Sequence, residues 1–270
     1  MYLVKRSALV CIMAANASTG GLRHAPATTA EPGTDTTTLE PLQGEFGLPN
    51  PFSNRSGLAL HRAAWSGDIR GVRSLLEQGA NAQEADNKGV TILMAAVHSQ
   101  NLDLIDLVVQ RGVNVDQGDT IIGKTALIMA IDDISLDVME CLIRNGANVN
   151  QAQTNGQTAL MAAARINMGP YMERSRRQMV DILIRAGVEI DQADNHGSTA
   201  LIEAVRSRNL YMVQRLIEAG ADVAHTMNNG RSALDDAEEE IRCYGNDPTL
   251  VAIIEALHQA PKHDSGYVLK

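Results

Sequence analysis

The stretch DNHGSTALIEAVRSRNLYMVQRLIEAGADV, residues 194–223, contains a turn followed by two short helical patterns. Its His-Gly pair fits a tight turn that needs a positive φ angle, and Thr199 can cap the helix that follows. The first helical pattern is rich in Ala, so neighbouring backbones can approach closely, whereas the second carries paired Leu and Ile at helical spacing. Gly220 fits a left-handed helix end. The stretch therefore predicts one turn–helix–helix unit.

The same unit recurs along the chain, and two series of glycines mark it. One glycine of each unit lies in the turn and the other follows the second helix, and they are separated by 23 residues in Gly89–Gly112, Gly123–Gly146 and Gly197–Gly220. Successive units are 33 or 34 residues apart, as from Gly79 to Gly112. A fixed period of this length predicts a solenoid, in which each unit buries its apolar face against its neighbours.

One unit is longer, because Gly156 and Gly187 are separated by 31 residues instead of 23. The eight additional residues fall between its two helices, in INMGPYMERSR, where Gly169 and Pro170 should end the first helix. The run that starts at Tyr171 and Met172 predicts a lengthened second helix that projects beyond the stack. It also carries a dense basic cluster, formed by Arg174, Arg176 and Arg177. We interpret this insertion as a partner-contact element, with a solvated surface loop as the alternative.

The recurring unit resembles the ankyrin repeat, whose motif is D-x-x-G-x-T-P-L-H-x-A-A. The Pro of that motif is Ala or Ile in TALM, TALI and TILM, and its His is kept only at His61. The resemblance implies an all-α solenoid of helix–turn–helix units with hairpin tips over residues 53–260. We count five full repeats and a degenerate sixth, which begin near Asn54, Asp86, Thr120, Gln153, Asp194 and Met227.

The sixth unit has a longer and more acidic first helix than the others. A terminal repeat has no neighbour on one side, so its outer face must be polar. We therefore expect its acids to form a solvated cap, with an acidic docking patch as the alternative. These acids are Asp235, Asp236, Glu238, Glu239 and Glu240.

Composition agrees with closely packed short helices. The chain is 44% hydrophobic but only 3% aromatic, so its core must be aliphatic. The formal net charge of −9 gives no general attraction to nucleic acid or to an anionic membrane surface. We expect neither as a partner, and no segment approaches the roughly 18 apolar residues of a membrane span.

The N-terminus has the layout of a weak signal peptide over residues 1–17. Lys5 and Arg6 precede a short apolar run, and Ala15-Asn16-Ala17 offers a small-x-small cleavage pattern. This layout predicts export to the periplasm or beyond, and a cytoplasmic chain with a disordered N-terminal tail is the alternative. Residues 18–52 are rich in Thr, Pro and Gly and predict a flexible tether, and residues 261–270 predict a tail.

We found no catalytic or metal-binding constellation, and we expect no enzyme activity and no cofactor. Motifs such as H-E-x-x-H, C-x-x-C, G-x-S-x-G and the P-loop are absent from the sequence. His61 stands at the structural His of the resembled motif, where it should hydrogen-bond a turn. Cys141 lies in an apolar helical strip and is expected in the core, too far from Cys243 for a disulfide within one chain.

The resemblance also implies where a partner would bind. In the family, contacts come from the turn residues that flank the glycine and from two residues after the Ala pair of the first helix. The turn positions here are Asn87, Lys88, Val90, Ile122, Lys124, Asn155, Gln157, Asn195, His196, Ser198, Asn229 and Arg231. The helix positions are Trp65, Ser66, His98, Ser99, Asp132, Asp133, Arg165, Ile166, Arg206 and Ser207.

Two features of these positions favour a protein partner. Trp65 is the only Trp of the chain, and Trp in a groove is a frequent binding hot spot. The alternative is that Trp65 packs under the tether, against Phe46 or Phe52. Charges also alternate along the groove, from Asp132 and Asp133 to Arg165 and then Arg206. A mixed groove suits a protein surface better than a polyanion.

The sequence thus predicts a monomeric, non-catalytic protein that binds one protein partner. Small exported bacterial proteins of the resembled family suggest a role in protecting or inhibiting that partner, for example a toxin or a redox enzyme in the periplasm. A secreted effector that binds host proteins is the alternative, and an enzyme with an unrecognised site is a further one. The sequence does not identify the partner, because binding specificity lies in variable surface residues.

Overall fold

A computed structural model describes residues 55–166, 173–245 and 247–261 of the chain. In these ranges the regular elements are α-helices, and Thr226 and Ser232 form an isolated β-bridge. The prediction of an all-α fold is therefore confirmed. The helices are α1 (Arg55–Trp65), α2 (Ile69–Glu77), α3 (Ile92–Ser99), α4 (Leu102–Gln110), α5 (Ala126–Asp132), α6 (Leu136–Arg144), α7 (Ala159–Arg165), α8 (Glu173–Arg185), α9 (Ala200–Arg206), α10 (Leu210–Glu218), α11 (Ala233–Tyr244) and α12 (Pro248–Gln259).

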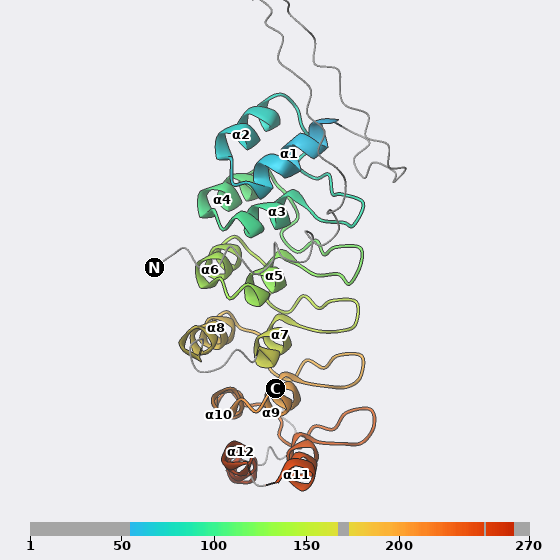
Figure 1. Cartoon of the computed structure of the whole chain (residues 1–270), viewed down its shortest axis with the longest axis vertical. Helices are drawn as coiled ribbons and strands as arrows, with labels where there is room; N and C mark the ends of the chain where they lie inside the picture. The colour runs from blue at the N-terminus through green and yellow to red at the C-terminus, as the bar shows by residue number, and fades with distance from the viewer. Residues whose placement is uncertain (1–54, 167–172, 246, 262–270) are drawn as a thin grey trace, which may run out of the picture. The chain divides into compact units, whose positions relative to one another are not determined.

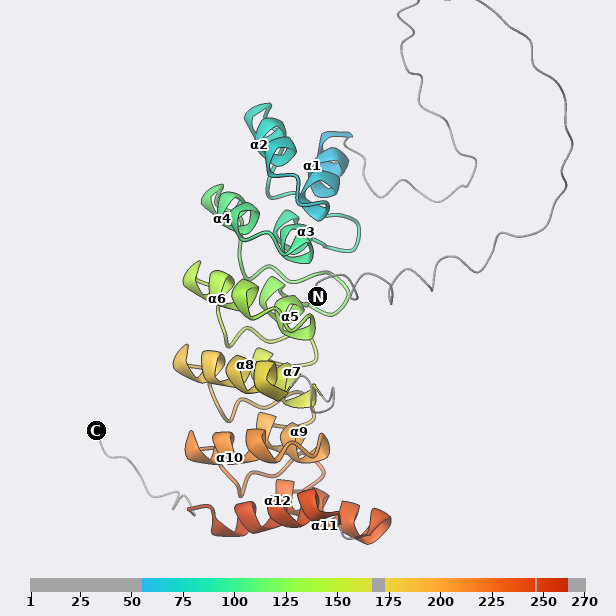
Figure 2. The ribbon, with the colours of Figure 1, turned by 60° about the vertical axis from the view of Figure 1, so that its left-hand side comes forward.

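The helices form two parallel rows, as Figures 1 and 2 show. Each odd-numbered helix contacts the next odd one, from α1 to α11, and the even-numbered helices contact one another in the same way from α2 to α12. Each repeat supplies one helix to each row, so repeat one is α1 and α2 and repeat six is α11 and α12. Long loops lead into α3, α5, α7, α9 and α11 and project from the odd-numbered row, on the side away from the even-numbered row (Figure 1).

Local capping explains where the helices begin. The hydroxyl groups of Thr91, Thr125 and Thr158 each accept a hydrogen bond from the backbone N–H three residues later, at 3.2, 3.3 and 3.3 Å. Asn101 caps α4 in the same way, since its side chain accepts from the N–H of Leu104 at 3.2 Å. Each such cap stabilises its helix by roughly 1 kcal/mol. The predicted threonine cap is therefore confirmed in repeats two, three and four. In repeat five it is wrong, because Thr199 stands at the start of α9 but its side chain accepts no capping hydrogen bond.

The core follows from the contrast between the two rows. All residues of α3 from Ile92 to Val97 are buried, because this helix lies between two neighbours and the even-numbered row. Small residues allow this close approach, and the six residues from Ala159 to Ala164 in α7 are likewise buried. An even-numbered helix buries one face only, and in α6 that face includes Cys141 at 0% exposure.

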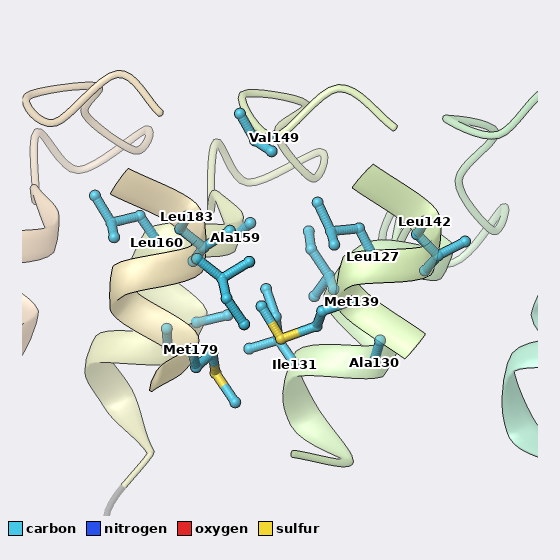
Figure 3. Close-up of a cluster of buried hydrophobic side chains, with 14 of the residues drawn as sticks. Leu127, Ala130, Ile131, Met139, Leu142, Val149, Ala159, Leu160, Met179 and Leu183 are labelled. Carbon is cyan, nitrogen blue, oxygen red and sulfur yellow. The ribbon is translucent and has the colours of Figure 1, made fainter. Parts of the chain in front are cut away.

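Aliphatic side chains join each repeat to the next. Figure 3 shows this packing between repeats three and four, where Ile131 and Met139 face Leu160 and Met179. These four side chains are fully buried. Burying one such side chain contributes roughly 1.5–3 kcal/mol, so the apolar layer supplies most of the stability of the stack.

Backbone hydrogen bonds also join successive hairpin tips. The N–H of Thr120 donates to the carbonyl of Lys88 at 2.9 Å, and the N–H of Thr154 donates to the carbonyl of Ile122 at 2.9 Å. The series continues in the next two tips. The N–H of Asn195 donates to the carbonyl of Asn155, and the N–H of Asn228 donates to the carbonyl of His196, each at 3.0 Å. At Gly89, with φ of 75°, an added Cβ would lie 2.4 Å from the nitrogen of Thr120, so only Gly fits this close contact. The tips thus form a connected row.

The insertion of repeat four lengthens the second helix, as predicted. Helix α8 has 13 residues, whereas α4, α6 and α10 each have 9. In repeats two, three and five a single left-handed residue ends the first helix, and these residues are Gln100, Ile134 and Arg208. The equivalent residue of repeat four is Asn167, which lies outside the described residues. Ile166, one position earlier, is extended, with φ of −65° and ψ of 113°. Tyr171, Met168 and Met172 lie outside the described residues.

The structural role predicted for His61 is confirmed. Its side chain is 7% exposed, with Nδ1 3.0 Å from the carbonyl oxygen of Gly57 and Nε2 3.0 Å from that of Val90. Val90 belongs to the turn of the next repeat. The imidazole therefore connects α1 to the first hairpin tip.

The solvated acidic cap expected on repeat six is wrong for Asp236. Its side chain is only 8% exposed, and its two carboxylate oxygens each lie 2.8 Å from a guanidinium nitrogen, one of Arg206 and one of Arg231. Glu239 pairs with Arg231, and Glu240 pairs with Arg208 at 2.8 Å. The acids face arginines of repeat five and of the last tip, because the lengthened α11 packs its acidic face toward α9.

Candidate protein-binding surface

The surface to be considered comprises the hairpin tips and the exposed ends of the odd-numbered helices. Most of the residues predicted to contact a partner are exposed there, and Lys124 is half-buried. Ser198, which the repeat register also placed among these positions, is buried at 1% exposure. The exposed ones are Trp65, Ser66, Asn87, Lys88, His98, Ile122, Asp132, Asp133, Asn155, Arg165, Asn195, His196, Arg206 and Asn229. They come from successive repeats and lie along one side of the two rows, because equivalent positions of stacked repeats repeat in space.

Trp65 and His98 form an exposed aromatic pair. Their ring centroids are 3.7 Å apart and the ring planes meet at 22°, so the two rings are stacked. Trp65 ends α1 and His98 lies at the equivalent place in α3, which is why adjacent repeats bring them together. Trp65 stays 49% exposed, so about half of its surface is open to solvent beside the stacked His98 ring. Phe46 and Phe52, the alternative packing partners, lie outside the described residues.

On this surface, repeat three presents an ion pair, whose two charges cancel, and an exposed acidic residue. Lys124 Nζ lies 2.5 Å from the carboxylate of Asp132, so these two charges compensate each other across α5. Asp133 is exposed at the C-terminal end of the helix. A surface ion pair of this kind contributes little to stability, roughly 0–1 kcal/mol.

In repeats four to six, the predicted groove charges are already paired within the chain. Glu203 lies 3.9 Å from Arg165 and 3.2 Å from Arg206, and Arg206 also binds Asp236 at 2.8 Å. Neither Glu203 nor Asp236 was among the predicted contact positions. The alternation of charge expected along the groove is therefore present, but here it joins one repeat to the next. Desolvating such paired charges against a partner gives little net affinity.

The arginine cluster of the insertion is divided between internal contacts and solvent. Arg176 donates to the carbonyl of Ile166 at 2.9 Å and pairs with Glu173, and its side chain is 14% exposed. Burial lowers the pKa of this guanidinium, and the nearby charge of Arg177 lowers it further. Arg176 therefore ties the start of α8 to the end of α7.

Arg177 binds in the opposite direction, toward α10. Its guanidinium lies 4.3 Å from the ring centre of Tyr211, and its Nε lies 3.0 Å from Glu173. In the same region, the carboxylate of Asp181 forms an ion pair with the guanidinium of Arg215 at 3.0 Å. Arg174 is exposed. A partner contact through these arginines stays a prediction, but two of the three also hold the lengthened helix in place.

Sequence reasoning missed Ile121, the most exposed aliphatic side chain of this surface. Ile121 is 64% exposed and Ile122, which was predicted as a turn position, is 42% exposed. The signal was the step of 34 residues between Gly112 and Gly146, because one additional residue lengthens this tip. Where the additional residue points was not contained in the spacing.

The described ranges give little support for a metal site, a ligand pocket or a reactive thiol. They contain no group of three or more His, Cys, Asp or Glu side chains that could hold a metal ion. A hollow of about 350 Å³ is lined by Arg206, Arg231, Asp236 and Glu239, whose charges pair with one another, and by the exposed Cys243. Cys141 is fully buried, and burial raises the pKa of its thiol, as does a hydrogen bond to Asp106, so the nucleophilic thiolate is disfavoured.

Among the described residues, no helix is both long enough and apolar enough to span a membrane.

Comparison with known proteins agrees with this architecture. A family model described as ankyrin repeats (3 copies) matches residues 60–153, 134–227 and 171–254. A search of curated proteins found no match. An ankyrin repeat domain from Acinetobacter baumannii AYE superposes with a TM-score of 0.61 and 28% identity, over 74% of this chain and 96% of that one. The ankyrin repeat domain of Bcl-3, a member of the IkappaB protein family, superposes with a TM-score of 0.63 and 26% identity, over 76% of this chain and 86% of that one.

Proposed function

The chain belongs to the ankyrin repeat family, and from this premise we propose that it binds one specific protein partner and performs no catalysis itself. Repeats of this family generally mediate contacts between proteins. The binding surface would be the groove along the odd-numbered helices together with the hairpin tips. Function in this family resides in surface residues and not in the shared motif, so particular side chains decide which partner binds.

The observation that carries the proposal is the stacked pair of Trp65 and His98. These residues occupy two contact positions in successive repeats, and their stacking fixes the indole in one orientation while 49% of Trp65 stays exposed. An ordered, half-exposed Trp costs little conformational entropy to bury, which is why Trp is enriched among binding hot spots. The surrounding mixture of Lys, Asp and Arg suits a protein surface better than a polyanion.

The N-terminal sequence supports a more specific role. Its basic, apolar and small segments favour export to the periplasm, where the chain would protect or inhibit one exported protein. Sequencing the N-terminus of the protein recovered from cells tests this part. Cleavage after Ala17 supports the periplasmic role, whereas an intact N-terminus on protein found outside the cell supports delivery as an effector.

Affinity purification from the native cell envelope tests partner binding. Wild-type protein and a Trp65→Ala variant would each be immobilised, captured proteins identified, and the dissociation constant of the captured protein measured. We expect Trp65→Ala to weaken binding at least tenfold, about 1.4 kcal/mol. Tyr244→Ala is the matched control, because Tyr244 is an exposed aromatic residue on the last repeat (77% exposed). Equal binding by wild type and Trp65→Ala would contradict the groove as the binding site.

A further inference from the structure

The tip of repeat three is built differently from the other tips. Asp119 precedes it, and one Oδ1 of this carboxylate accepts three backbone N–H bonds, from Ile121 at 3.1 Å, Ile122 at 2.8 Å and Lys124 at 3.3 Å. Asp86 makes two such bonds in the tip of repeat two, from Lys88 and Val90, each at 2.8 Å. The additional bond holds the additional residue, so the longer tip is as well ordered by its own backbone as the shorter one.

Neighbouring tips hold this segment from both sides. Thr120 N–H donates to the carbonyl of Lys88 at 2.9 Å. On the other side, the carbonyl of Ile122 accepts from both the N–H and the hydroxyl of Thr154, at 2.9 and 3.1 Å. The repeat-three tip (residues 119–124) is therefore hydrogen-bonded to both neighbouring tips, and its backbone is held in place before any partner arrives.

On this frame the chain exposes two isoleucines. The corresponding outermost residues of the other tips are polar, namely Lys88, Asn155, His196 and Asn229. Isoleucine is β-branched and unfavourable in turns, and an isoleucine that is 64% exposed contributes little to folding. A pair of exposed aliphatic side chains on a preorganised tip gains free energy when another surface covers it, and loses little entropy in doing so.

The charges beside the tip are also informative. The carboxylates of Asp86 and Asp119 accept backbone N–H groups, and the ammonium group of Lys124 is paired with Asp132. Lys88 is exposed on the adjoining tip and has no ion pair within the described residues. The two isoleucines therefore have a cation next to them in a protein whose net charge is −9.

We infer that Ile121 and Ile122 anchor the protein partner by entering an aliphatic pocket on its surface, with an acidic side chain at the pocket rim facing Lys88. This inference rests on the proposed function and names the chemistry of the partner. Apolar anchors that enter a pocket are typical binding hot spots, and a rim charge adds steering and register. The anchor lies on the repeat-three tip, separate from the Trp65–His98 pair on the helices.

The test uses the full-length chain with a photo-crosslinking residue, p-benzoylphenylalanine, in place of Ile121 or, as the control, of Val251. Val251 is an exposed aliphatic residue on α12 (37% exposed). We expect irradiation in a native envelope extract to attach the protein captured by wild type to position 121 and not to position 251. Equal crosslinking at the two positions, or none at position 121, would overturn the inference.

Affinity measurements with the captured protein give the second readout. The double variant Ile121→Asn, Ile122→Asn should bind 10- to 100-fold more weakly, because Asn suits a turn and leaves the fold intact, as a thermal melt will show. Val251→Asn should bind like wild type. Lys88→Glu should weaken binding several-fold and reduce its dependence on salt.

The outcomes separate this inference from the proposed function. If Trp65→Ala weakens binding and the Asn double variant does not, the anchor is wrong and the groove stands. A wild-type chain that captures no protein overturns both. If sedimentation shows a dimer that the double variant abolishes, the isoleucines meet a second copy of the chain, and the heterologous pocket is wrong.

Discussion

The first three repeats and the last three have similar cores but different surfaces. Repeats one to three expose Trp65, Ile121 and Ile122, and within the described residues their charged side chains form the single ion pair of Lys124 with Asp132. From Arg165 onward, arginines and acids pair repeatedly, both within and between repeats. Even the exposed Tyr244 has the guanidinium of Arg208 at 5.5 Å from its ring centre.

This contrast indicates that the two halves of the stack have different roles, one in binding and the other in holding the repeats together. Charges that pair with neighbouring repeats already have partners. A protein that covers them must desolvate them, and the net gain in binding free energy is small. Apolar groups left in water gain from being covered. We therefore expect the first three repeats to supply most of the binding energy, and the last three to hold the end of the array together. Three experiments examine this difference, from the largest expected effect to the smallest.

Leu160→Ala cuts the packing where the two halves meet. Leu160 is 0% exposed and faces repeat three across the cluster of Figure 3. We expect the free energy of unfolding, measured by urea denaturation, to fall by about 3 kcal/mol. Ile121→Ala is the control and should change it by less than about 0.5 kcal/mol, because its side chain is largely in water. A loss below about 1 kcal/mol for Leu160→Ala would show that the halves do not depend on this contact.

Asp236→Ala breaks the charge network of the last repeats. Its carboxylate binds Arg206 and Arg231, and these arginines are 42% and 38% exposed, so solvent screens part of the effect. We expect a loss of about 1–2 kcal/mol in the same urea measurement. Asp133→Ala, an exposed acid of repeat three, should cost less than about 0.5 kcal/mol. Equal losses would contradict the proposed difference between the halves.

Substituting Gly at the left-handed residue that ends the first helix should have opposite effects in the two halves. Gln100 in repeat two and Arg208 in repeat five have φ of 57° and 54°. Gly relieves the strain of this conformation, so Gln100→Gly should raise the free energy of unfolding by about 0.5 kcal/mol. Arg208→Gly should lower the thermal midpoint, because it removes the pairs with Glu240 and Asp247. An increase in both variants would show that the Arg208 pairs contribute nothing.

Local features of the fold were predictable because they depend on neighbouring residues. Thr91 and Thr125 cap helices, His61 bonds a turn and Cys141 lies in the core, as the repeat pattern indicated. The lengthening of α8 followed from the same logic, since helix-forming residues continue upstream of its core positions. Each of these outcomes needs only the period of the repeat and the conformational preference of a few adjacent residues.

The candidate site was predictable only in part. The positions of Trp65 and His98 followed from the repeat register, but their stacking required two repeats to be brought together. Arg176 and Arg177 were recognised as a cluster, yet their contacts with Ile166 and Tyr211 were not. The partners of Asp236 and the exposure of Ile121 were missed for a similar reason, because both depend on how one repeat lies against the next.

By itself, then, the sequence determined a periodic, all-helical stack with an insertion at repeat four and a row of variable surface positions. Periodicity is sufficient for this, since each unit contacts only its neighbours and each neighbour has the same pattern. Only the tertiary structure decided which of the variable residues are available to a partner. Availability depends on pairing between residues about 30 positions apart, such as Arg206 with Asp236, and pairing of that kind is set by distance in space.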